Sequence, residues 1–448
     1  MTEERELFEQ AVEGLASRSS AVAVVGLGYV GLPLVAAFLD AGFRVLGIDC
    51  DGQKIEQLRG GQSYVAAVPS ETIRSAVKDG SLRLAPTLAA VTGCGATCIC
   101  VPTPLAAGRT PDLSFVQTTV AEMAPHLAEQ ALVVLVSTTY PGTTSEIVAP
   151  LLEAAGRRIG KTCYLAYAPE REDPGNQAYR TRDLPRVVGA DDDCSRQMVS
   201  TLFEGVVDRV VAVSSSAAAE ATKMLENSFR AVNIALANEM KTILGALGLD
   251  VFEVIEASAT KPFGFMPFYP GPGLGGHCIP IDPFYLSWRA RQIGQEARFI
   301  ELAGIVNTEM PGRVVAALDR ALQERGQKLL GARVLVMGVA YKADVDDPRE
   351  SPAFEILHQL NMLGARISYH DPHIPVAPTM RSWKLPPLSS VPLDDATLAS
   401  VDAVVIVTAH TAVDHDRVLE SCSLVVDTRG VTRNSPVRAQ HPDRVVDA

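Results

Sequence analysis

One cysteine stands in a sequence context that suits covalent chemistry. Cys278 follows a run rich in glycine and proline, and Asp282 comes four residues later. Prolines remove backbone donors and glycines admit close approach, so residues 265–286 predict a fixed loop and not a long helix or a central strand. A thiol presented by such a loop beside a carboxylate is a candidate nucleophile. The alternative for an isolated cysteine is a buried structural thiol.

A lysine and an asparagine lie one helical turn apart upstream of that loop. The segment 217–247 contains no proline, and the serines at 214–216 suit the N-cap of a long helix. Lys223 and Asn227 share one face of this predicted helix. Both can donate hydrogen bonds to a developing oxyanion. The alternative is a solvated polar stripe.

A glycine-rich turn between an apolar run and a helical stretch predicts a dinucleotide site. Gly26 allows the tight turn, Gly28 admits a pyrophosphate, and Gly31 lets the helix pack closely. A second apolar run ends at Asp49, where a carboxylate binds a ribose hydroxyl and repels a 2′-phosphate. We therefore expect NAD and not NADP. Lys54 follows on the next helix and could reach the ribose, with a solvated surface lysine as the alternative.

Further apolar runs alternate with helical patterns, which predicts a doubly wound parallel sheet. These runs are 96–101, 132–136 and 164–168. Thr103, Thr138, Glu170 and Glu172 follow them, and ligands bind beyond the carboxyl ends of such strands. We expect these side chains near the cofactor. Turn hydroxyls, caps and solvated acids are the alternatives.

A second, smaller α/β pattern begins after Gly331 and lacks the glycine-rich turn. Lys342 and Arg429 follow its apolar runs, where they could hold a second anionic ligand. The predicted fold is two Rossmann-like, doubly wound parallel-sheet domains of the α/β class, joined by a long central helix. The predicted regions are a polar leader (1–20), an NAD-binding domain (21–213), a central helical domain (214–325) and a C-terminal domain (326–448).

Composition excludes several kinds of partner. The 448 residues carry a net charge of -12, with 47% hydrophobic and 21% charged residues. This balance argues against nucleic-acid binding and against a basic membrane-binding surface. The acidic N-terminus is not a secretory signal, and no apolar run is long enough to span a bilayer. Eight scattered cysteines fit neither a disulfide framework nor a zinc pattern, so we expect reduced thiols and a cytoplasmic protein.

Taken together, these segments resemble the family of nucleotide-sugar 6-dehydrogenases, the UDP-glucose/GDP-mannose dehydrogenases. The motifs are GLGYVGLP (26–33), VPTP (101–104), STTYPGTT (137–144), APEREDPGN (168–176), ATKMLENSFRAVN (221–233), GGHCIPIDP (275–283) and YKADVDDPRES (341–351). They cover essentially the whole chain after the leader. The segments around 169–176 and 261–286 are most similar to the branch that acts on UDP-N-acetyl-D-glucosamine, in the synthesis of bacterial surface polysaccharides such as lipopolysaccharide.

The resemblance implies a four-electron oxidation of the sugar C6 alcohol to a carboxylate, with two NAD and no metal. It implies that Cys278 forms a thiohemiacetal and then a thioester. Lys223 and Asn227 match positions that stabilise oxyanions. Asp282 matches a carboxylate that holds or activates water together with Thr138, and Glu170 matches an acid that assists proton transfer.

The resemblance and the residue patterns together name the expected binding residues. For the cofactor these are Gly26, Gly28, Tyr29, Val30, Gly31, Asp49, Lys54, Thr103, Thr138, Glu172 and Arg349. For the UDP-sugar they are Glu170, Arg171, Lys223, Asn227, Lys261, Phe268, Tyr269, Gly275, Lys342 and Arg429. Pro174 stands where the UDP-glucose branch has a glutamate, so Glu172 as its replacement and the identity of the first general base stay open. A homodimer or a larger homo-oligomer is expected.

Other functions remain open from the sequence. Within the same reaction, UDP-glucose, UDP-N-acetylgalactosamine and UDP-N-acetylmannosamine are alternative substrates. A two-electron hydroxyacid dehydrogenase would share the dinucleotide domain, the long helix and the Lys/Asn pair, but it would need no cysteine. A non-catalytic NAD-sensing protein would release no NADH with any UDP-sugar.

Overall fold

The computed structural model describes residues 3–171, 181–276, 279–380 and 383–448. They form two compact units: Met1–Glu226 with Trp288–Gln295, and Asn227–Ser287 with Glu296–Ala448. The predicted central region 214–325 contributes residues to both units, and its boundaries as a domain stay a prediction.

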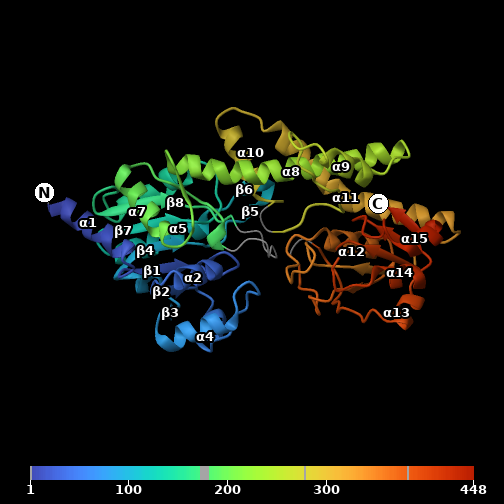
Figure 1. Ribbon diagram of the computed structural model, residues 1–448, viewed down its shortest axis with the longest axis horizontal. Helices are drawn as coiled ribbons and strands as arrows, with labels where there is room; N and C mark the ends of the chain where they lie inside the picture. The colour runs from blue at the N-terminus through green and yellow to red at the C-terminus, as the bar shows by residue number, and fades with distance from the viewer. Residues whose placement is uncertain (1–2, 172–180, 277–278, 381–382) are drawn as a thin grey trace. The chain divides into compact units, whose positions relative to one another are not determined.

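The first unit is built on a mixed but mainly parallel sheet (Figure 1). Among the described residues, its eight strands lie in the order β10-β9-β8-β7-β4-β1-β2-β3. They are β1 (Ala21–Val25), β2 (Val45–Ile48), β3 (Leu82–Ala85), β4 (Cys94–Ile99), β7 (Ala131–Leu135), β8 (Cys163–Tyr167), β9 (Arg186–Gly189) and β10 (Val210–Val213). All neighbours pair in parallel except β8 and β9, which share an antiparallel bridge.

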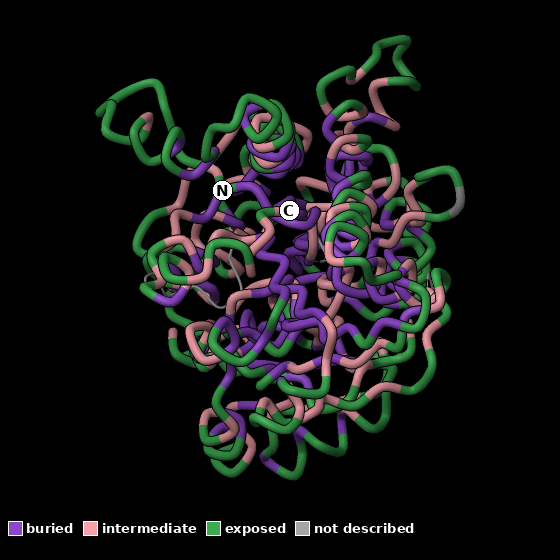
Figure 2. Tube along the Cα trace, turned by 90° about the vertical axis from the view of Figure 1, so that its right-hand side faces the viewer, coloured by how far each residue is buried: buried purple, intermediate pink, exposed green. Residues whose placement is uncertain are grey.

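Helices cover both faces of this sheet, as the doubly wound prediction requires. They are α1 (Glu3–Ala16), α2 (Gly31–Asp40), α3 (Gly52–Arg59), α4 (Ser70–Asp79), α5 (Ser114–Met123), α6 (Ala149–Ala154) and α7 (Asp193–Glu204), with a small hairpin of β5 (Leu105–Ala106) and β6 (Thr110–Pro111). Val22 and Val24 pack in one core with α2 and α7, whereas Ala23 and Val25 pack in another with α5 and α6. The buried strands thus separate two hydrophobic layers. Figure 2 shows which stretches of the chain are buried, in purple, and which are exposed, in green.

The segment that the sequence presents as a polar leader contains helix α1. Its apolar side chains Phe8, Val12 and Leu15 recur at helical spacing, and Leu15 is buried in the core of the first unit. The Phe8 ring lies 5.3 Å from the Tyr164 ring, measured between centroids. Acidic residues between these positions mask the apolar stripe in the composition of the segment.

The second unit contains long helices and a parallel sheet of its own. Its described strands lie in the order β12-β11-β13-β14-β15, and its helices enclose separate hydrophobic cores on the two faces of that sheet. The strands are β11 (Arg333–Met337), β12 (Arg366–His370), β13 (Ala403–Ile406), β14 (Val425–Asp427) and β15 (Val445–Asp447). The helices are α9 (Val251–Ala259), α11 (Arg298–Glu324), α12 (Pro352–Met362), α13 (Asp395–Ser400), α14 (His415–Ser421) and α15 (Pro436–Gln440). Helix α10 (Asp282–Gln292) begins in this unit and contributes its residues from Trp288 onward to the first.

Helix α8 (Ser216–Ala246) contributes residues to both units and confirms the predicted long helix. The hydroxyl of Ser215 accepts a hydrogen bond from the backbone N–H of Ala218, as expected of the serine-rich cap. The two parallel-sheet units and this helix confirm the predicted α/β fold class. No described helix is long and apolar enough to cross a membrane.

Candidate active site

The glycine-rich turn after β1 has the geometry that a dinucleotide needs. Gly26 adopts a φ of +89°, and a Cβ there would lie 2.6 Å from the carbonyl oxygen of Cys100. A Cβ on Gly31 would overlap the carbonyl oxygen of Gly26, so the start of helix α2 depends on glycine at this position. Nothing lies within 4 Å of a Cβ on Gly28, which leaves that backbone open to a ligand.

Asp49 ends strand β2 at the same edge of the sheet and is 7% exposed. One carboxylate oxygen accepts the backbone N–H of Leu27 at 2.9 Å, and Lys54 Nζ lies 3.3 Å from the same oxygen. The other oxygen accepts the N–H of Asp51 at 2.9 Å. A carboxylate fixed beside the glycine turn suits a ribose diol and disfavours a 2′-phosphate, so these residues fit NAD.

Two threonines predicted near the cofactor lie together in the structure. The hydroxyl of Thr103, after β4, donates to the carbonyl oxygen of Thr138, after β7, at 2.8 Å. Beside them, Ser137 Oγ donates to the carbonyl oxygen of Val101 at 2.7 Å. Tyr29 is 40% exposed, and Val30 is the N-cap residue of α2. The residues predicted to bind the cofactor in the first unit therefore follow neighbouring strand ends, as the fold predicts.

Glu170 is held in a buried ion pair that the sequence did not reveal. One of its carboxylate oxygens lies 2.7 Å from Arg186 Nη1, and the other accepts the backbone N–H of Arg171 at 2.7 Å. The side chain of Arg186 is 5% exposed. Both carboxylate oxygens of Glu170 are therefore already engaged in hydrogen bonds. An arginine at the start of an apolar strand is the only sequence signal of this pair.

Arg171 and Glu172, predicted to contact substrate and cofactor, follow Glu170. The guanidinium of Arg171 pairs with Glu226 at 2.6 Å and donates to the carbonyl oxygen of Pro185 at 2.7 Å. Arg171 is therefore tied to the helix that carries Lys223. Glu172 lies outside the described residues.

Helix α8 places Lys223 and Asn227 one turn apart, and both are buried, at 8% and 7% exposure. The amide of Asn227 donates to a carboxylate oxygen of Asp282 at 2.6 Å. Asp282 is the first residue of α10 and is 4% exposed. Within the described ranges, Lys223 has no hydrogen-bond or ion-pair partner. A buried ammonium in this state favours an anionic partner such as an oxyanion.

Glu220 joins helix α8 to the loop after Thr138, and it was not among the predicted residues. Its carboxylate accepts the N–H of Gly142 at 2.6 Å, the N–H of Thr144 at 2.8 Å and the Thr144 hydroxyl at 2.7 Å. Burial raises the pKa of Glu220 to about 7, against these hydrogen bonds, which lower it. An acid three residues before Lys223, among alanines, is the signal that could have identified it.

In the second unit, the glycine- and proline-rich segment is irregular over its described residues 265–276, as predicted, and hydrogen bonds from two of its backbone N–H groups fix it. The predicted loop is wrong over 282–286, because helix α10 begins at Asp282. The N–H of Gly271 donates to the side-chain oxygen of Asn238 at 2.9 Å. The N–H of Gly276 donates to the carbonyl oxygen of Arg349 at 3.0 Å. A Cβ on Gly275 would lie 2.7 Å from the Cβ of Tyr341. Cys278, two residues after Gly276 in the chain, lies outside the described residues.

Arg429 follows β14, and its half-buried side chain brings a positive charge to this loop. A Cβ on Gly271 would overlap its guanidinium, so the loop passes directly over it. Its Nε donates to the carbonyl oxygen of Val407 at 2.8 Å. Burial lowers the pKa of Arg429 to about 10, and Asp427 acts in the opposite direction. A half-buried arginine facing a glycine-rich loop suits a phosphate group.

The remaining predicted substrate residues occupy less enclosed positions in the second unit. The Phe268 ring lies 5.7 Å from the Phe229 ring, and the Tyr269 ring stacks 6.2 Å from the Phe252 ring. Lys261 is exposed, with its Nζ 5.1 Å from the ring of Phe263. Lys342 is half-buried and follows Tyr341, whose side chain lies against Gly275 and Gly276.

Arg349, predicted to contact the cofactor, is held within the second unit by Asp347. Its Nη2 lies 2.6 Å from one carboxylate oxygen of Asp347, and its Nε lies 2.9 Å from the other. The carbonyl oxygen of Arg349 accepts the hydrogen bond from the N–H of Gly276. By holding Arg349, the ion pair therefore helps to fix the loop. Its contact with the cofactor stays a prediction.

The other cysteines are poor nucleophiles wherever they are buried. Burial raises the pKa of Cys98 to about 12, that of Cys163 to about 11 and that of Cys422 to about 11. These thiols stay protonated near neutral pH and act as small apolar side chains. Chemistry through a thiolate therefore has to come from elsewhere in the chain.

Comparisons with known proteins agree with this geometry. Three domains of the UDP-glucose/GDP-mannose dehydrogenase family match the chain: the NAD binding domain at residues 20–207, the central domain at 217–309 and the UDP binding domain at 335–434. The chain is 32% identical to UDP-N-acetyl-D-glucosamine 6-dehydrogenase of Pseudomonas aeruginosa over 392 residues, 87% of this chain and 90% of that protein.

Other relatives carry a different sugar in their names. UDP-N-acetyl-D-mannosamine dehydrogenase of Escherichia coli K12 is 32% identical over 428 residues, 92% of this chain and 99% of that protein. The solved structure of a UDP-D-ManNAc dehydrogenase from Pyrococcus horikoshii superposes with a TM-score of 0.84 at 30% identity, covering 93% of this chain and 97% of that one. The chain belongs to the UDP-glucose/GDP-mannose dehydrogenase family and is an NAD-dependent oxidoreductase.

Proposed function

We propose that the protein oxidises the C6 hydroxyl of UDP-N-acetyl-D-glucosamine to a carboxylate in two successive two-electron steps. The observation that carries the proposal is the buried hydrogen bond between Asn227 and Asp282, 2.6 Å long and one helical turn from the buried Lys223. It joins the helix that bears the oxyanion donors to the helix that begins four residues after Cys278. This arrangement is useful to an enzyme that carries out acyl chemistry on a cysteine.

Bound NAD supplies the hydride acceptor for each of the two steps. Gly26, Gly28, Gly31 and Asp49 would hold it, because the turn leaves its backbone open and the acid is fixed beside it. In our proposal the substrate aldehyde is attacked by the Cys278 thiolate, which forms a carbon–sulfur bond and leaves a thiohemiacetal alkoxide. Lys223 and Asn227 donate to that oxygen.

Loss of a second hydride converts the thiohemiacetal into a thioester, which water then cleaves. The thiolate of Cys278 leaves, and the carboxylate product takes its second oxygen from the water. We assign Asp282 to hold and activate this water, because its buried carboxylate is already oriented by Asn227. Glu170 is a weaker candidate for the first general base, since Arg186 holds its carboxylate.

A half-buried arginine supports the proposed nucleotide site in the second unit. Arg429 has a pKa lowered to about 10 by burial, and an anionic ligand would recover part of that cost. Lys342 follows Tyr341, whose side chain lies against Gly275 and Gly276, and we assign Lys342 and Arg429 to the diphosphate of the substrate.

UDP-N-acetyl-D-mannosamine is the second candidate substrate. It is favoured by the TM-score of 0.84 with the Pyrococcus horikoshii structure, while the Pseudomonas aeruginosa relative favours the glucosamine epimer. The two sugars differ only at C2, so the choice depends on contacts around the N-acetyl group.

The test is a panel of four UDP-sugars with NAD, in which NADH and residual sugar are both measured. We expect UDP-N-acetylglucosamine to react fastest and to release two NADH per sugar, with UDP-N-acetylmannosamine, UDP-N-acetylgalactosamine and UDP-glucose slower. A ratio of one NADH per sugar would contradict the four-electron course. Faster oxidation of UDP-N-acetylmannosamine would overturn the choice of sugar alone.

The cysteine step is tested with Cys278→Ser and a matched control. We expect Cys278→Ser to abolish formation of the carboxylate, and Cys194→Ser, in helix α7 of the first unit, to keep wild-type turnover. Full conversion to the acid by Cys278→Ser would contradict covalent catalysis.

We also propose that the protein self-associates through helix α8. Phe229, Leu236 and Ile243 are spaced seven residues apart and are 48%, 52% and 48% exposed. Large apolar side chains at this spacing form one stripe, which suits a second copy of the same helix. We expect Leu236→Asp to convert the species seen by light scattering into monomers, with Glu239→Gln as the control. An unchanged mass would count against this interface.

A further inference from the structure

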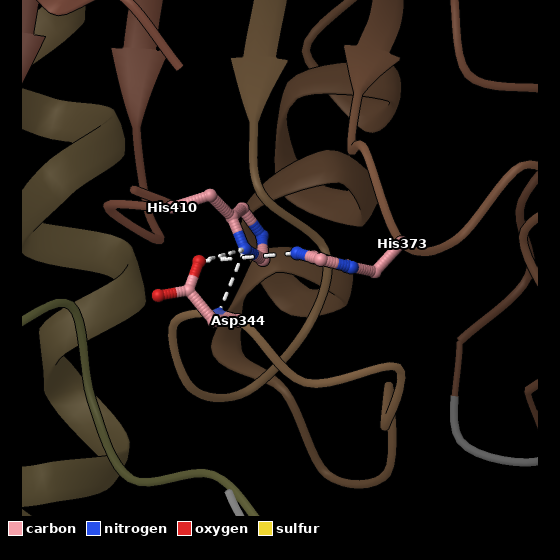
Figure 3. Close-up of side chains that lie close together, drawn as sticks. All are labelled: Asp344, His373 and His410. Carbon is pink, nitrogen blue, oxygen red and sulfur yellow. Dashed lines mark hydrogen bonds and ion pairs between the residues drawn. The ribbon is translucent and has the colours of Figure 1, made fainter. Parts of the chain in front are cut away.

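Three potential metal ligands converge in the second unit, and none of them is among the residues assigned to the redox reaction. Asp344 lies in the segment after β11, His373 follows β12 and His410 follows β13 (Figure 3). These strands are neighbours in the sheet, so their carboxyl ends bring the three segments to one edge. The residues are far apart in the chain, which is why their spacing gave no signal.

The distances are close to those of a metal site. Asp344 Oδ1 lies 3.8 Å from His373 Nε2 and 3.8 Å from His410 Nδ1, and all three ligand atoms lie within 4.8 Å of one another. Ligand atoms bound to one zinc ion at about 2.1 Å are roughly 3.0–3.5 Å apart. Closing the cluster therefore requires shifts of a few tenths of an ångström up to about an ångström, within the reach of side-chain rotations.

A buried carboxylate orients His410 as in protein metal centres. His410 Nε2 lies 3.2 Å from Asp371 Oδ2, and His410 is 1% exposed. The same oxygen of Asp371 accepts the backbone N–H groups of Val339 and Ala340, each at 2.9 Å. A carboxylate held in this way acts as an acceptor, so Nε2 carries the proton and Nδ1 presents its lone pair toward Asp344. Metal-binding histidines have this carboxylate partner on the other ring nitrogen.

The arrangement has a competing explanation in which His410 is a structural side chain. Its Nδ1 accepts the backbone N–H of Asp344 at 3.0 Å, and Asp344 Oδ1 accepts the N–H of Thr411 at 2.9 Å. Binding of an ion would replace the first of these bonds with a metal–nitrogen bond. The structural explanation leaves the side chain of His373 with a ring contact to His410, 5.0 Å between centroids, and a long contact to Asp344. It does not explain why His373 Nε2 points at the other two ligand atoms in Figure 3.

Exposure gives the cluster an entry path for an ion. The side chains of Asp344 and His373 are 39% and 34% exposed, whereas His410 is buried beneath them. The buried His410 therefore offers a fixed Nδ1. The more exposed side chains of Asp344 and His373 can rotate to complete the coordination of an ion. Nitrogen and carboxylate donors in this combination suit Zn²⁺ and similar divalent transition metals.

We propose that Asp344, His373 and His410 bind one divalent transition-metal ion of the Zn²⁺ class, with a water in the remaining coordination position. The ion ties together the segments that follow three neighbouring strands, including the segment that begins with Tyr341 and Lys342. It takes no electrons and is separate from the oxidation of the sugar, so the proposal stands or falls independently of that reaction.

The test is a Co²⁺ titration of the full chain carrying Cys278→Ser, which removes the thiol that we propose as the nucleophile and so one competing ligand. We expect one equivalent of Co²⁺ to give visible d–d absorption without a thiolate charge-transfer band, and one equivalent of Zn²⁺ to displace it. Adding His373→Ala should lower the affinity at least 100-fold. His126→Ala removes an exposed histidine of the first unit and should leave the titration unchanged.

A second variant and a second readout guard against misfolding. Asp344→Asn keeps the size of the side chain and should weaken Co²⁺ binding at least 10-fold. We expect Zn²⁺ to raise the thermal unfolding midpoint of the Cys278→Ser protein and to leave that of its His373→Ala derivative unchanged, with equal circular dichroism before metal is added. Absence of a one-to-one complex, a thiolate band, or equal affinity in His373→Ala would overturn the proposal.

Discussion

The two α/β units use the same frame at the start of their sheets. In each, a glycine with positive φ follows the first strand: Gly26 at +89° and Gly338 at +84°. In each, an aspartate at the end of the next strand accepts backbone N–H groups from that glycine turn, namely Asp49 in the first unit and Asp371 in the second. A strand, a tight turn and a capping acid therefore do not by themselves make a dinucleotide site.

The two units differ in the segment that comes after the glycine turn. In the first unit helix α2 begins at Gly31, so its N-terminus faces the ligand edge. In the second unit helix α12 begins only at Pro352, and the intervening segment carries Lys342 and Arg349. The second unit thus has two cationic side chains in the stretch of chain where the first unit has a helix N-terminus.

Asp49 and Asp371 also differ in how exposed their side-chain partners are. Asp49 keeps a half-exposed lysine as its partner, whereas Asp371 is sealed beneath the buried His410. We expect Asp49 to exchange its lysine partner for a ribose hydroxyl. We expect Asp371, which is buried together with His410, only to stabilise the fold. Substitutions in the two units test this contrast, from the largest expected effect to the smallest.

In the first unit, one glycine substitution should lower the stability of the fold, and another should lower the affinity for NAD. Gly31→Ala places a Cβ onto the carbonyl oxygen of Gly26, and we expect it to cost more than about 3 kcal/mol of stability. Gly28→Ala has open space, so we expect a folded protein with at least a tenfold higher Kd for NAD. Isothermal titration and thermal unfolding measure the two effects.

The matched change in the second unit is Gly338→Ala. Its Cβ would lie 2.8 Å from the backbone nitrogen of Thr408, so it should destabilise that unit while NAD affinity remains within twofold of wild type. If Gly338→Ala lost NAD binding strongly while its fold stayed intact, the assignment of NAD binding to the glycine turn of the first unit alone would be wrong.

Neutralising the two aspartates should give opposite results. Asp371→Asn places an amide where the carboxylate accepts several backbone N–H groups, and we expect a loss of about 2–3 kcal/mol. Asp49→Asn should cost less stability, but should raise the Kd for NAD about tenfold and reduce discrimination against NADP. Titrations with NAD and NADP and hydrogen exchange of each unit distinguish these outcomes, and equal NAD affinity in Asp49→Asn would contradict the assigned role.

The separation along the chain between interacting residues decides which features the sequence could predict. The glycine turn, the acid after the second strand and the long helix are encoded in spacings of a few residues, and the structure has all three where those spacings place them. The pairing of Glu170 with Arg186 and the convergence of Asp344 with two histidines depend on tertiary contacts between distant segments. No local pattern reports such contacts, and buried partners can reverse the role that a residue type suggests.

The pH dependence of stability should reveal a strained carboxylate in the first unit. Burial raises the pKa of Glu220 from 4.5 to about 7, so the folded state binds a proton more tightly than the unfolded state. Its contribution is present below pH 4.5 and is lost as pH rises through about 7. We expect stability to fall by about 2 kcal/mol from this group between about pH 5 and pH 8.

Glu220→Gln removes the titration and should flatten this slope. One oxygen remains to accept from Thr144, while the bond from Gly142 is lost, so the variant should be less stable at about pH 5 and closer to wild type at about pH 8. Thermal unfolding across this pH range measures the difference in stability between wild type and Glu220→Gln. Glu153→Gln, on the surface of the same unit, is the control. Parallel profiles for wild type and Glu220→Gln would show that the carboxylate does not titrate there.

The smallest effect is expected at Lys54, and it tests why Asp49 can serve a ligand. Lys54 Nζ lies 3.3 Å from Asp49, and the lysine side chain is 37% exposed, so solvent screens the pair. We expect Lys54→Met to change stability by less than about 1 kcal/mol. If Asp49 exchanges this lysine for the ribose, removing the lysine should change the Kd for NAD by only about two- to threefold. A loss of NAD affinity as large as that in Asp49→Asn would mean that the ion pair itself is the binding element, and the contrast with the sealed Asp371 would then rest on burial alone.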